Sequence, residues 1–246
     1  MRVQAESPFL SEVRSIVADF SLLRHPFYVA WSAGQLTRDD LKAYACQYLH
    51  QVLAEPAYLS AVHSNTPHFA EDGSSDLRAR QAILRNLMDE ELGASNHPEL
   101  WKRFARSLGA DERELAQTQP LPTTNNLVQT FSDICRNRPY YAGLSALHAF
   151  ESQVPGIAEV KIDGLRRFYG MTNPSDYEFF TVHREADVAH SATEWEFIEK
   201  AADTESKRAE VLAATRDACG ALWQFLSGVA DDAGLSTCAT DATNAS

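Results

Sequence analysis

The sequence has neither a cluster of basic residues nor a long apolar run. Lys and Arg number 22 against 34 Asp and Glu, which gives a formal net charge of -12. Nucleic acids and anionic membranes are bound by clustered cations, so we expect neither as a partner. No apolar run approaches the ~18 residues of a membrane-spanning helix. The first residues also lack the basic-then-apolar pattern of a signal peptide. We therefore expect a cytoplasmic protein.

Two further absences concern cysteine pairs and alternating patterns. The four cysteines are isolated, without a C-x-x-C pair: Cys46, Cys135, Cys219 and Cys238. This spacing favours reduced thiols over a disulfide or a structural zinc site. No stretch alternates apolar and polar residues for long enough to predict a strand. The fold class that remains is all-α.

Apolar residues recur instead at helical spacing along most of the chain. This periodicity predicts helices over residues 8–24, 37–62, 76–91, 98–108, 126–135, 140–169, 175–202 and 204–229. Pro56 and the pair Pro155-Gly156 predict kinks, and residues 25–36 are expected to form a connecting turn. The length favours one domain, over 1–229. Residues 230–246 are too poor in large apolar groups to offset the entropy of ordering, which predicts a disordered tail.

The helix predicted over 175–202 contains a stripe of possible metal ligands. His183, Asp187 and His190 stand at positions i, i+4 and i+7, which fall on one face at about 100° per residue. Two imidazoles and a carboxylate on one face can bind one metal ion. Helical bundles also use such a stripe as half of a two-metal site, with carboxylates from other helices.

Candidates for the other half lie on two segments. Glu90 and His97 are seven residues apart, and the neighbours Asp89 and Glu91 leave open which acid points inward. Glu151 lies close to the apolar face of its helix, where an acid is costly unless it is paired. His148, three residues earlier, is an alternative ligand.

Other residues admit simpler interpretations. Tyr28, Tyr44 and Tyr48 are the type of aromatic residue that most often packs in a core with a hydrogen-bonded hydroxyl. Cys135 has no histidine near it in sequence that could activate it as a nucleophile.

Five blocks of the sequence, in order, resemble one known family. The blocks are Phe27-Tyr28-Val29-x-Trp31-Ser32, Asn86-Leu87-Met88-Asp89-Glu90-Glu91, Asn96-His97, Glu151-Ser152-Gln153-x-Pro155 and His183-x-Glu185-Ala186-Asp187-Val188-x-His190. They resemble the branch of the haem-oxygenase-like dimetal oxidases that includes the chlamydial protein associated with death domains, with TenA thiaminases and pyrroloquinoline-quinone synthase as more distant relatives. The resemblance runs from about Leu10 to Leu226. The chain departs from it by an insertion around 66–75, by His148, by Phe150, by Pro98 and in the tail.

This resemblance implies a haem-oxygenase-like bundle of about seven to eight helices with six metal ligands: Glu90, His97, Glu151, His183, Asp187 and His190. It implies two ions, Fe/Fe or Mn/Fe, together with dioxygen and an external reductant. It also implies a self-sacrificing para-aminobenzoate synthase for folate supply, in which Tyr28 is consumed, Lys161 is the amino donor and Tyr44 takes part. A homodimer is expected by analogy.

Three alternatives remain at this level. The same metal site could oxidise an external small molecule, such as an amine or a fatty acid. The chain could be a non-catalytic interaction protein that binds a partner through its helical surface or tail. A thiaminase-like enzyme would need a catalytic cysteine and no metal. Metal content and the fate of Tyr28 distinguish these possibilities.

Overall fold

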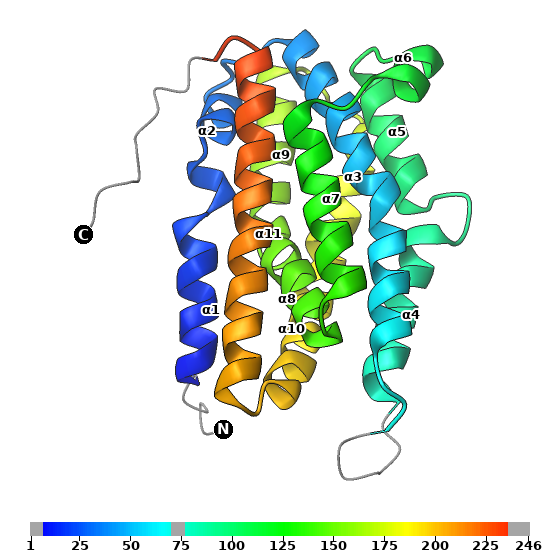
Figure 1. Ribbon diagram of the computed structural model, residues 1–246. Coiled ribbons are helices and arrows are strands. Elements are labelled where there is room, and N and C mark those ends of the chain that lie inside the picture. The colour runs from blue at the N-terminus through cyan, green and yellow to red at the C-terminus, as the bar shows by residue number, and fades with distance from the viewer. Residues whose placement is uncertain (1–6, 70–76, 236–246) are drawn as a thin grey trace, which may run out of the picture.

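The computed structural model describes residues 7–69 and 77–235, and these residues form helices joined by short connections (Figure 1). The helices are α1 (Pro8–Asp19), α2 (Pro26–Ser32), α3 (Arg38–Asn65), α4 (Arg78–Glu91), α5 (His97–Ser107), α6 (Glu112–Gln117), α7 (Pro122–Asn137), α8 (Tyr140–Glu151), α9 (Val154–Phe168), α10 (Glu178–Ala201) and α11 (Glu205–Asp232), with the short 3₁₀ turns η1 (Leu22–Arg24) and η2 (Pro174–Asp176). The all-α prediction is confirmed. The described part of the chain has more helices than the seven to eight expected.

The additional helices arise where proline begins a helix instead of bending one. Pro26 occupies the first position of α2, where its missing N–H costs nothing. The Nδ1 atom of His25 accepts a hydrogen bond from the Phe27 amide and caps this helix. The prediction of a connecting turn over 25–36 is therefore wrong for residues 26–32, which form α2. Pro155 likewise lies in the first turn of α9, so the expected kink in 140–169 is a boundary between α8 and α9.

Helix α8 lies at the centre of the bundle. It packs against α3, α7, α10 and α11, and its residues from Ala142 to Ala149 are all buried. Small residues permit this close packing: a Cβ atom added at Gly143 would stand 2.6 Å from a methyl of Val62. The helix ends at Glu151, which is thereby placed inside the bundle.

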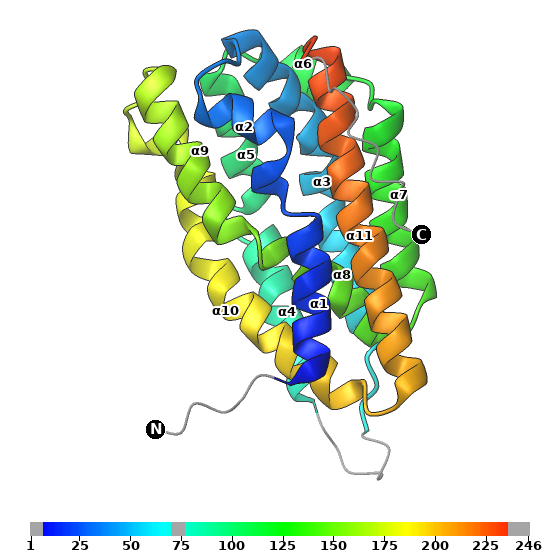
Figure 2. The ribbon, with the colours of Figure 1, turned by 90° about the vertical axis from the view of Figure 1, so that its left-hand side faces the viewer.

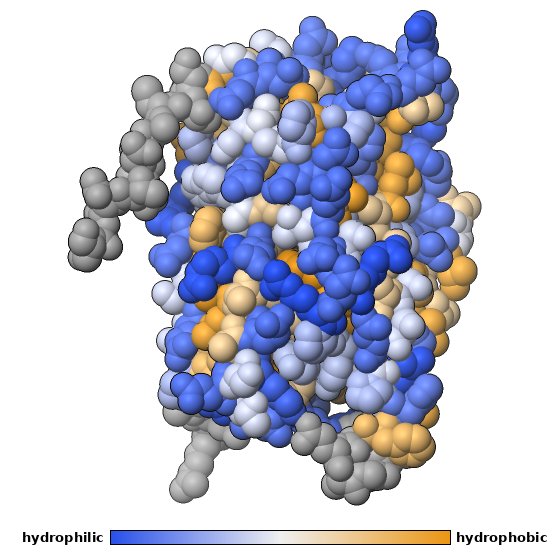
Figure 3. Space-filling view, in the orientation of Figure 1, coloured by the Kyte–Doolittle hydropathy of each residue, from blue (hydrophilic) through white to orange (hydrophobic). Residues whose placement is uncertain are grey.

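The outer helices turn polar faces to solvent. Figures 1 and 2 show α1 beside α11, and α9 beside α10 on another side of the bundle, as their contacts require. The face that α7 and α11 present in Figure 3 is mostly hydrophilic. Across the described ranges, no helix combines the length and the apolar character needed to cross a bilayer.

The end of α11 lies beyond the predicted boundary. The helix continues to Asp232 instead of stopping at residue 229, and Leu235 packs against the core. Residues 236–246, which hold Cys238 and most of the predicted tail, lie outside the described residues, as do residues 70–76 of the insertion. Cys46, Cys135 and Cys219 are free thiols.

Candidate metal centre and the adjoining cavity

The six candidate ligands form two adjacent clusters. Glu90, His97 and His183 make the first cluster, and Glu151, Asp187 and His190 make the second. Within each cluster the possible ligand atoms lie within 4.8 Å of one another. Nitrogen and oxygen ligands bind transition metals at ~2.0–2.2 Å, so this spacing suits one ion in each cluster. The stripe on α10 is therefore divided between the two.

The first cluster is assembled by a break in the chain. Helix α4 ends just after Glu90 and α5 begins at His97, so the two residues do not belong to one continuous helix. Asn96 caps α5 and also donates hydrogen bonds to the carbonyls of Glu91 and Gly93, which fixes the turn between the helices. As a result His97 Nδ1 lies 2.6 Å from Glu90 Oε1. Asp89 and Glu91 are exposed, so the structure turns only Glu90 of these three acids inward.

His183 completes the first cluster with a fixed ring. Its Nδ1 donates to the carbonyl oxygen of Phe179 over 2.8 Å, which leaves Nε2 free for a metal ion. The ring stacks on Phe179 and lies near His97. Burial lowers the pKa of His183 well below its ordinary value, with a further contribution from His97. The imidazole is thus neutral, which is the form that binds metals.

The second cluster contains buried oxygens without partners. Glu151 Oε1 accepts a hydrogen bond from Asn86 at 3.2 Å, but Glu151 Oε2 and Asp187 Oδ2 have no hydrogen-bond partner in the described part of the chain. Burial, reinforced by Asp187, raises the pKa of Glu151 to about 8. Such groups are costly when no cation is near. A divalent ion between them would remove this cost, so the residues present fit a metal ion.

Two further buried acids were missed by the sequence analysis. Burial raises the pKa of both Glu55 and Glu194 well above the ordinary value. Glu194 stands four residues after His190 on the same stripe, so an extension of that pattern would have found it. Glu55 precedes Pro56 among apolar residues of α3. A single acid in such a stretch indicates a buried carboxyl, so this position could have been found from the sequence.

His148, the alternative ligand, belongs to neither cluster. Its Nδ1 donates to the carbonyl oxygen of Ser191 over 3.0 Å, and burial lowers its pKa to about 4. Cys135 is buried as well, and burial raises the pKa of its thiol. A catalytic cysteine needs an accessible thiolate, so Cys135 does not fit a thiaminase-like role.

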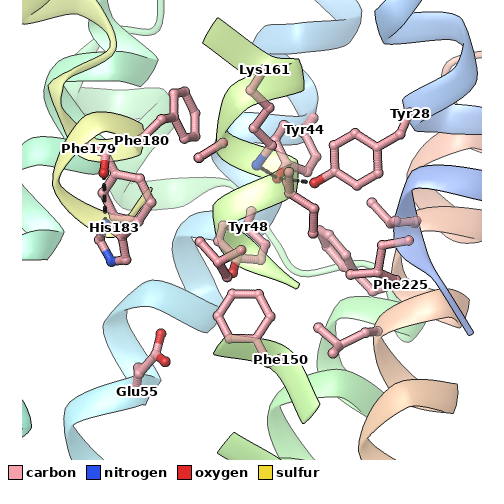
Figure 4. Close-up of a pocket in the computed structure, with 16 residues that line it drawn as sticks. Tyr28, Tyr44, Tyr48, Glu55, Phe150, Lys161, Phe179, Phe180, His183 and Phe225 are labelled. Carbon is pink, nitrogen blue, oxygen red and sulfur yellow. Dashed lines mark hydrogen bonds between the residues drawn. The ribbon is translucent and has the colours of Figure 1, made fainter. Parts of the chain in front are cut away.

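A cavity adjoins the first cluster and joins it to the candidate reactive residues (Figure 4). It is lined by His183 and Glu55 on one side and by Tyr28, Tyr44 and Lys161 on the other. The Tyr28 hydroxyl lies 3.3 Å from the Tyr44 hydroxyl, and Lys161 Nζ donates to the Tyr44 hydroxyl over 2.7 Å. The space open to the centre of a water molecule is about 30 Å³, enough for about one or two waters.

The position of Tyr28 differs from the expectation. The sequence predicted a turn from which the ring could swing, whereas Tyr28 lies in the first turn of α2 and is 3% exposed. Its ring contacts those of Phe27 and Trp31. Burial raises the pKa of the phenol, so Tyr28 is a neutral phenol held in a fixed place.

Lys161 is a buried amine enclosed by aromatic rings. The rings with centroids 4.8–5.9 Å from Nζ are those of Phe180, Tyr44, Tyr28, Trp101, Tyr48 and Trp31. Burial lowers the pKa of Lys161 to about 7, so a large share of the side chain is neutral amine near neutral pH. Trp31 donates to the Lys161 carbonyl, and a Cβ atom at Gly164 would stand 2.6 Å from the Trp31 ring. Close packing therefore holds this segment of α9 in place.

An all-α bundle that gathers buried carboxylates and imidazoles in this way has the donor set of a metal-dependent redox protein. The chain belongs to the family described as iron-containing redox enzymes, whose model matches residues 42–223. The predicted family and the prediction of a redox enzyme are thereby confirmed.

Similar proteins support the same assignment. The chain is 61% identical over 226 residues to the 4-aminobenzoate synthase of Nitrosomonas europaea, covering 92% of each chain. It is 40% identical over 230 residues to the 4-aminobenzoate synthase of Chlamydia trachomatis, covering 94% of this chain and 95% of that protein. A Shewanella denitrificans domain of unknown function with a haem-oxygenase-like fold superposes with a TM-score of 0.76 at 16% identity, covering 98% of this chain and 100% of that one. The predicted haem-oxygenase-like fold is confirmed.

Proposed function

We propose that the chain is an oxygen-dependent dimetal oxygenase that makes para-aminobenzoate from its own Tyr28 side chain, with Lys161 as the amino donor. Relatives at 61% and 40% identity that are named 4-aminobenzoate synthases support the product. The observation that carries the proposal is the hydrogen-bonded series Tyr28, Tyr44, Lys161 in a cavity that His183 also lines. A phenol, an amine and a candidate metal ligand thus share one enclosed space.

The two clusters would hold the metal ions. Three histidines and three carboxylates offset most of the charge of two divalent ions, and this donor set suits iron and manganese. Two iron ions, or one manganese and one iron, would supply the activation of dioxygen and the oxidation of a nearby phenol, with electrons from an external reductant.

The chain's own residues prepare the phenol and the amine. Burial keeps Tyr28 protonated and excludes water from its ring. The Tyr44 hydroxyl accepts from Lys161 and lies beside the Tyr28 hydroxyl, so it can pass a proton between the two. The lowered pKa of Lys161 leaves a lone pair on Nζ, 5.5 Å from the centre of the Tyr28 ring. In the proposed reaction a bond from this nitrogen to the ring would replace the phenol C–O bond, whose oxygen would leave as water, and the Cε–Nζ bond of Lys161 would break. The Cα–Cβ bond of Tyr28 would also break as Cβ is oxidised to the carboxylate, with dioxygen as the oxidant and electrons from the external reductant.

The size of the cavity favours this reaction over an external substrate. Sites for small molecules usually measure ~300–1,000 Å³, whereas the space beside Tyr28 is about 30 Å³. An amine or a fatty acid would have to displace Tyr28 or Lys161 before it could reach this position. A pure interaction module is also disfavoured, because the buried acids cost stability and would serve no purpose there.

The proposed reaction needs an electron donor as a partner besides dioxygen. We propose that no nucleic acid or membrane takes part, in keeping with the net charge of -12. We also propose a homodimer, by analogy. Sedimentation velocity of the metal-loaded chain tests the dimer, and a single species at the mass of one chain contradicts it.

Loading the full chain with metal without oxygen, and then adding oxygen and reductant, tests the function. Wild type should release at most one para-aminobenzoate per chain, with losses of mass localised to Tyr28 and Lys161. The Tyr28→Phe variant should release none while still binding metal. Tyr58→Phe is the matched control, because Tyr58 is buried but does not line the cavity. Para-aminobenzoate released by Tyr28→Phe would refute the sacrificial role.

The amino donor is tested with protein that carries nitrogen-15 only at the lysine Nζ atoms. The released para-aminobenzoate should carry the label, and Lys161→Arg should release none. Unlabelled product from the labelled wild type would exclude Lys161 while leaving the role of Tyr28 intact.

A further inference from the structure

Asp89 is next to the candidate ligand Glu90 in sequence, and its exposed side chain lies against the outer side of His190, a candidate ligand of the other cluster. Its Oδ2 atom lies 3.6 Å from Nε2 of His190. The second ring nitrogen of His190, Nδ1, lies 3.7 Å from Asp187 Oδ1 and 3.9 Å from Glu151 Oε2. The ring therefore presents one nitrogen inward to the cluster and the other outward to Asp89.

This orientation determines which nitrogen can bind an ion. A neutral imidazole has one N–H and one lone pair, and a metal-binding ring usually donates its N–H to an oxygen that fixes the tautomer. His183 meets this need within its own helix, through the carbonyl of Phe179. His190 has the opposite orientation, because Nδ1 faces the cluster and Nε2 needs an acceptor. Asp89, from α4, offers a carboxylate on that side.

The surroundings of His190 make such support necessary. A cleft of about 200 Å³ between α4 and α10 is lined by Asn86, Asp89, His190 and Glu194 among others. The His190 side chain is 19% exposed, whereas the other five candidate ligands are buried. A ring open to water on one side can rotate or exchange its acceptor. The carboxylate at the rim of the cleft counters this freedom.

We propose that Asp89 is a positioning residue for His190. Its carboxylate accepts the Nε2–H of the ring, keeps the Nδ1 lone pair directed at Glu151 and Asp187, and so raises the affinity of the second cluster for its ion. The separation of 3.6 Å is longer than a hydrogen bond, so the proposed contact forms when the two side chains move closer as the ion binds. The inference rests on the metal site of the proposed function, and it assigns to Asp89 a role apart from ligation.

The chain provides a matched control for the charge of Asp89. Glu91 is two residues away on the same helix, is exposed and has the same charge. If a negative charge on this surface only attracts cations in general, the Asp89→Asn and Glu91→Gln variants will have equal effects. If Asp89 orients His190, only the first variant weakens metal binding.

Titration of the metal-free full chain with Mn²⁺, with free ion measured by electron paramagnetic resonance, tests the proposal. Wild type should bind two ions. Asp89→Asn should bind one ion as wild type does and the other about 10- to 100-fold more weakly, the usual cost of losing such a supporting contact. Glu91→Gln should match wild type, and Asp89→Glu should recover most of the loss.

A second measurement is independent of affinity. In protein loaded with Zn²⁺ as a diamagnetic substitute, nitrogen-15 spectra should show a hydrogen-bonded Nε2–H on His190 that Asp89→Asn weakens. The proposal is overturned if Asp89→Asn binds both ions as wild type does. It is also overturned if Asp89→Asn and Glu91→Gln lose the same affinity, or if Asp89→Asn weakens the binding of both ions equally. Wild-type protein that binds two ions but makes no para-aminobenzoate contradicts the proposed function alone.

Discussion

The first cluster is closed and held by the protein, whereas the second cluster is open and partly unsupported. In the first, His97 already contacts Glu90 at 2.6 Å, and the His183 ring is tied to a backbone carbonyl. In the second, one oxygen each of Glu151 and Asp187 lacks a hydrogen-bond partner among the described residues, and the His190 side chain is 19% exposed. One helix, α10, contributes to both. In the first cluster an imidazole at hydrogen-bond distance offsets the burial of Glu90. In the second cluster His190 stays 3.7 Å from Asp187 and 3.9 Å from Glu151, so a bound ion would offset more of the cost of burying these two acids.

Glu151→Gln should have the largest effect, and it should act on the second cluster alone. Gln keeps the volume but removes the charge, so one of two Mn²⁺ ions should bind more than about 100-fold more weakly, since a lost ligand costs more than the ~10–100-fold of a lost supporting contact. The ion of the first cluster should be retained. Para-aminobenzoate formation should cease. Metal titration and product analysis on the same sample measure both effects.

Glu151→Gln should not lower the thermal stability of the metal-free protein. A buried carboxyl whose pKa is raised to about 8 opposes folding at pH 8, so the neutral amide should melt at the same or a higher temperature than wild type. Circular dichroism with a chelator present measures this. A lower melting temperature at pH 8 would mean that the charged Glu151 stabilises the metal-free bundle, and the contrast between the clusters would fail.

The stability of the metal-free protein should depend on pH through the buried acids of the second cluster, with a smaller effect than that of Glu151→Gln on metal binding. Glu151 has an ordinary pKa of 4.5 when unfolded and about 8 when folded, and the pKa of Asp187 is raised in the same direction. The folded state therefore binds more protons at these acids than the unfolded state does between the two values. The stability that the acids contribute is full below pH 4.5 and falls as the pH rises toward 8. Buried His183 acts in the opposite sense, because its lowered pKa costs stability only below pH 6.5. Between pH 6.5 and 8 His190, whose pKa is raised mainly by its contact with Asp187, acts in the same sense as the acids. Lys161, whose pKa burial lowers to about 7, acts in the opposite sense above pH 7. The difference between wild type and Glu151→Gln therefore isolates Glu151.

Melting curves between pH 6.5 and 8 measure this dependence. With chelator present the melting temperature should fall, and with Mn²⁺ present the fall should shrink or reverse, because ions bind the deprotonated ligands. In Glu151→Gln the fall with chelator should be smaller than in wild type. Equal slopes with and without metal would show that these acids do not bind the ions.

The helical pattern was sufficient to predict the fold class and the stripe on α10, because both depend on local periodicity. It could not predict the division of that stripe between two clusters, which depends on where α4 ends, where α5 begins and where α8 ends. Tyr28 was misplaced because Pro26 is compatible with a break or with the first turn of a helix. The outcome is set by contacts of His25 with Ser227 and Trp223, some 200 residues away. Such long-range contacts are not visible in a local pattern.

Asn86→Ala should have the smallest effect and the most selective one. Asn86 donates to Glu151 Oε1 at 3.2 Å, whereas His97 contacts Glu90 and His183 donates to the carbonyl of Phe179. The loss of Asn86 frees the Glu151 carboxyl to rotate, so the second ion should bind about 10-fold more weakly. The first ion should bind as in wild type, because the close pair of Glu90 and His97 does not depend on Asn86. Mn²⁺ titration resolves the two sites, and an equal loss at both would show that the clusters are held as one unit, in which case the difference in their support has no consequence for binding.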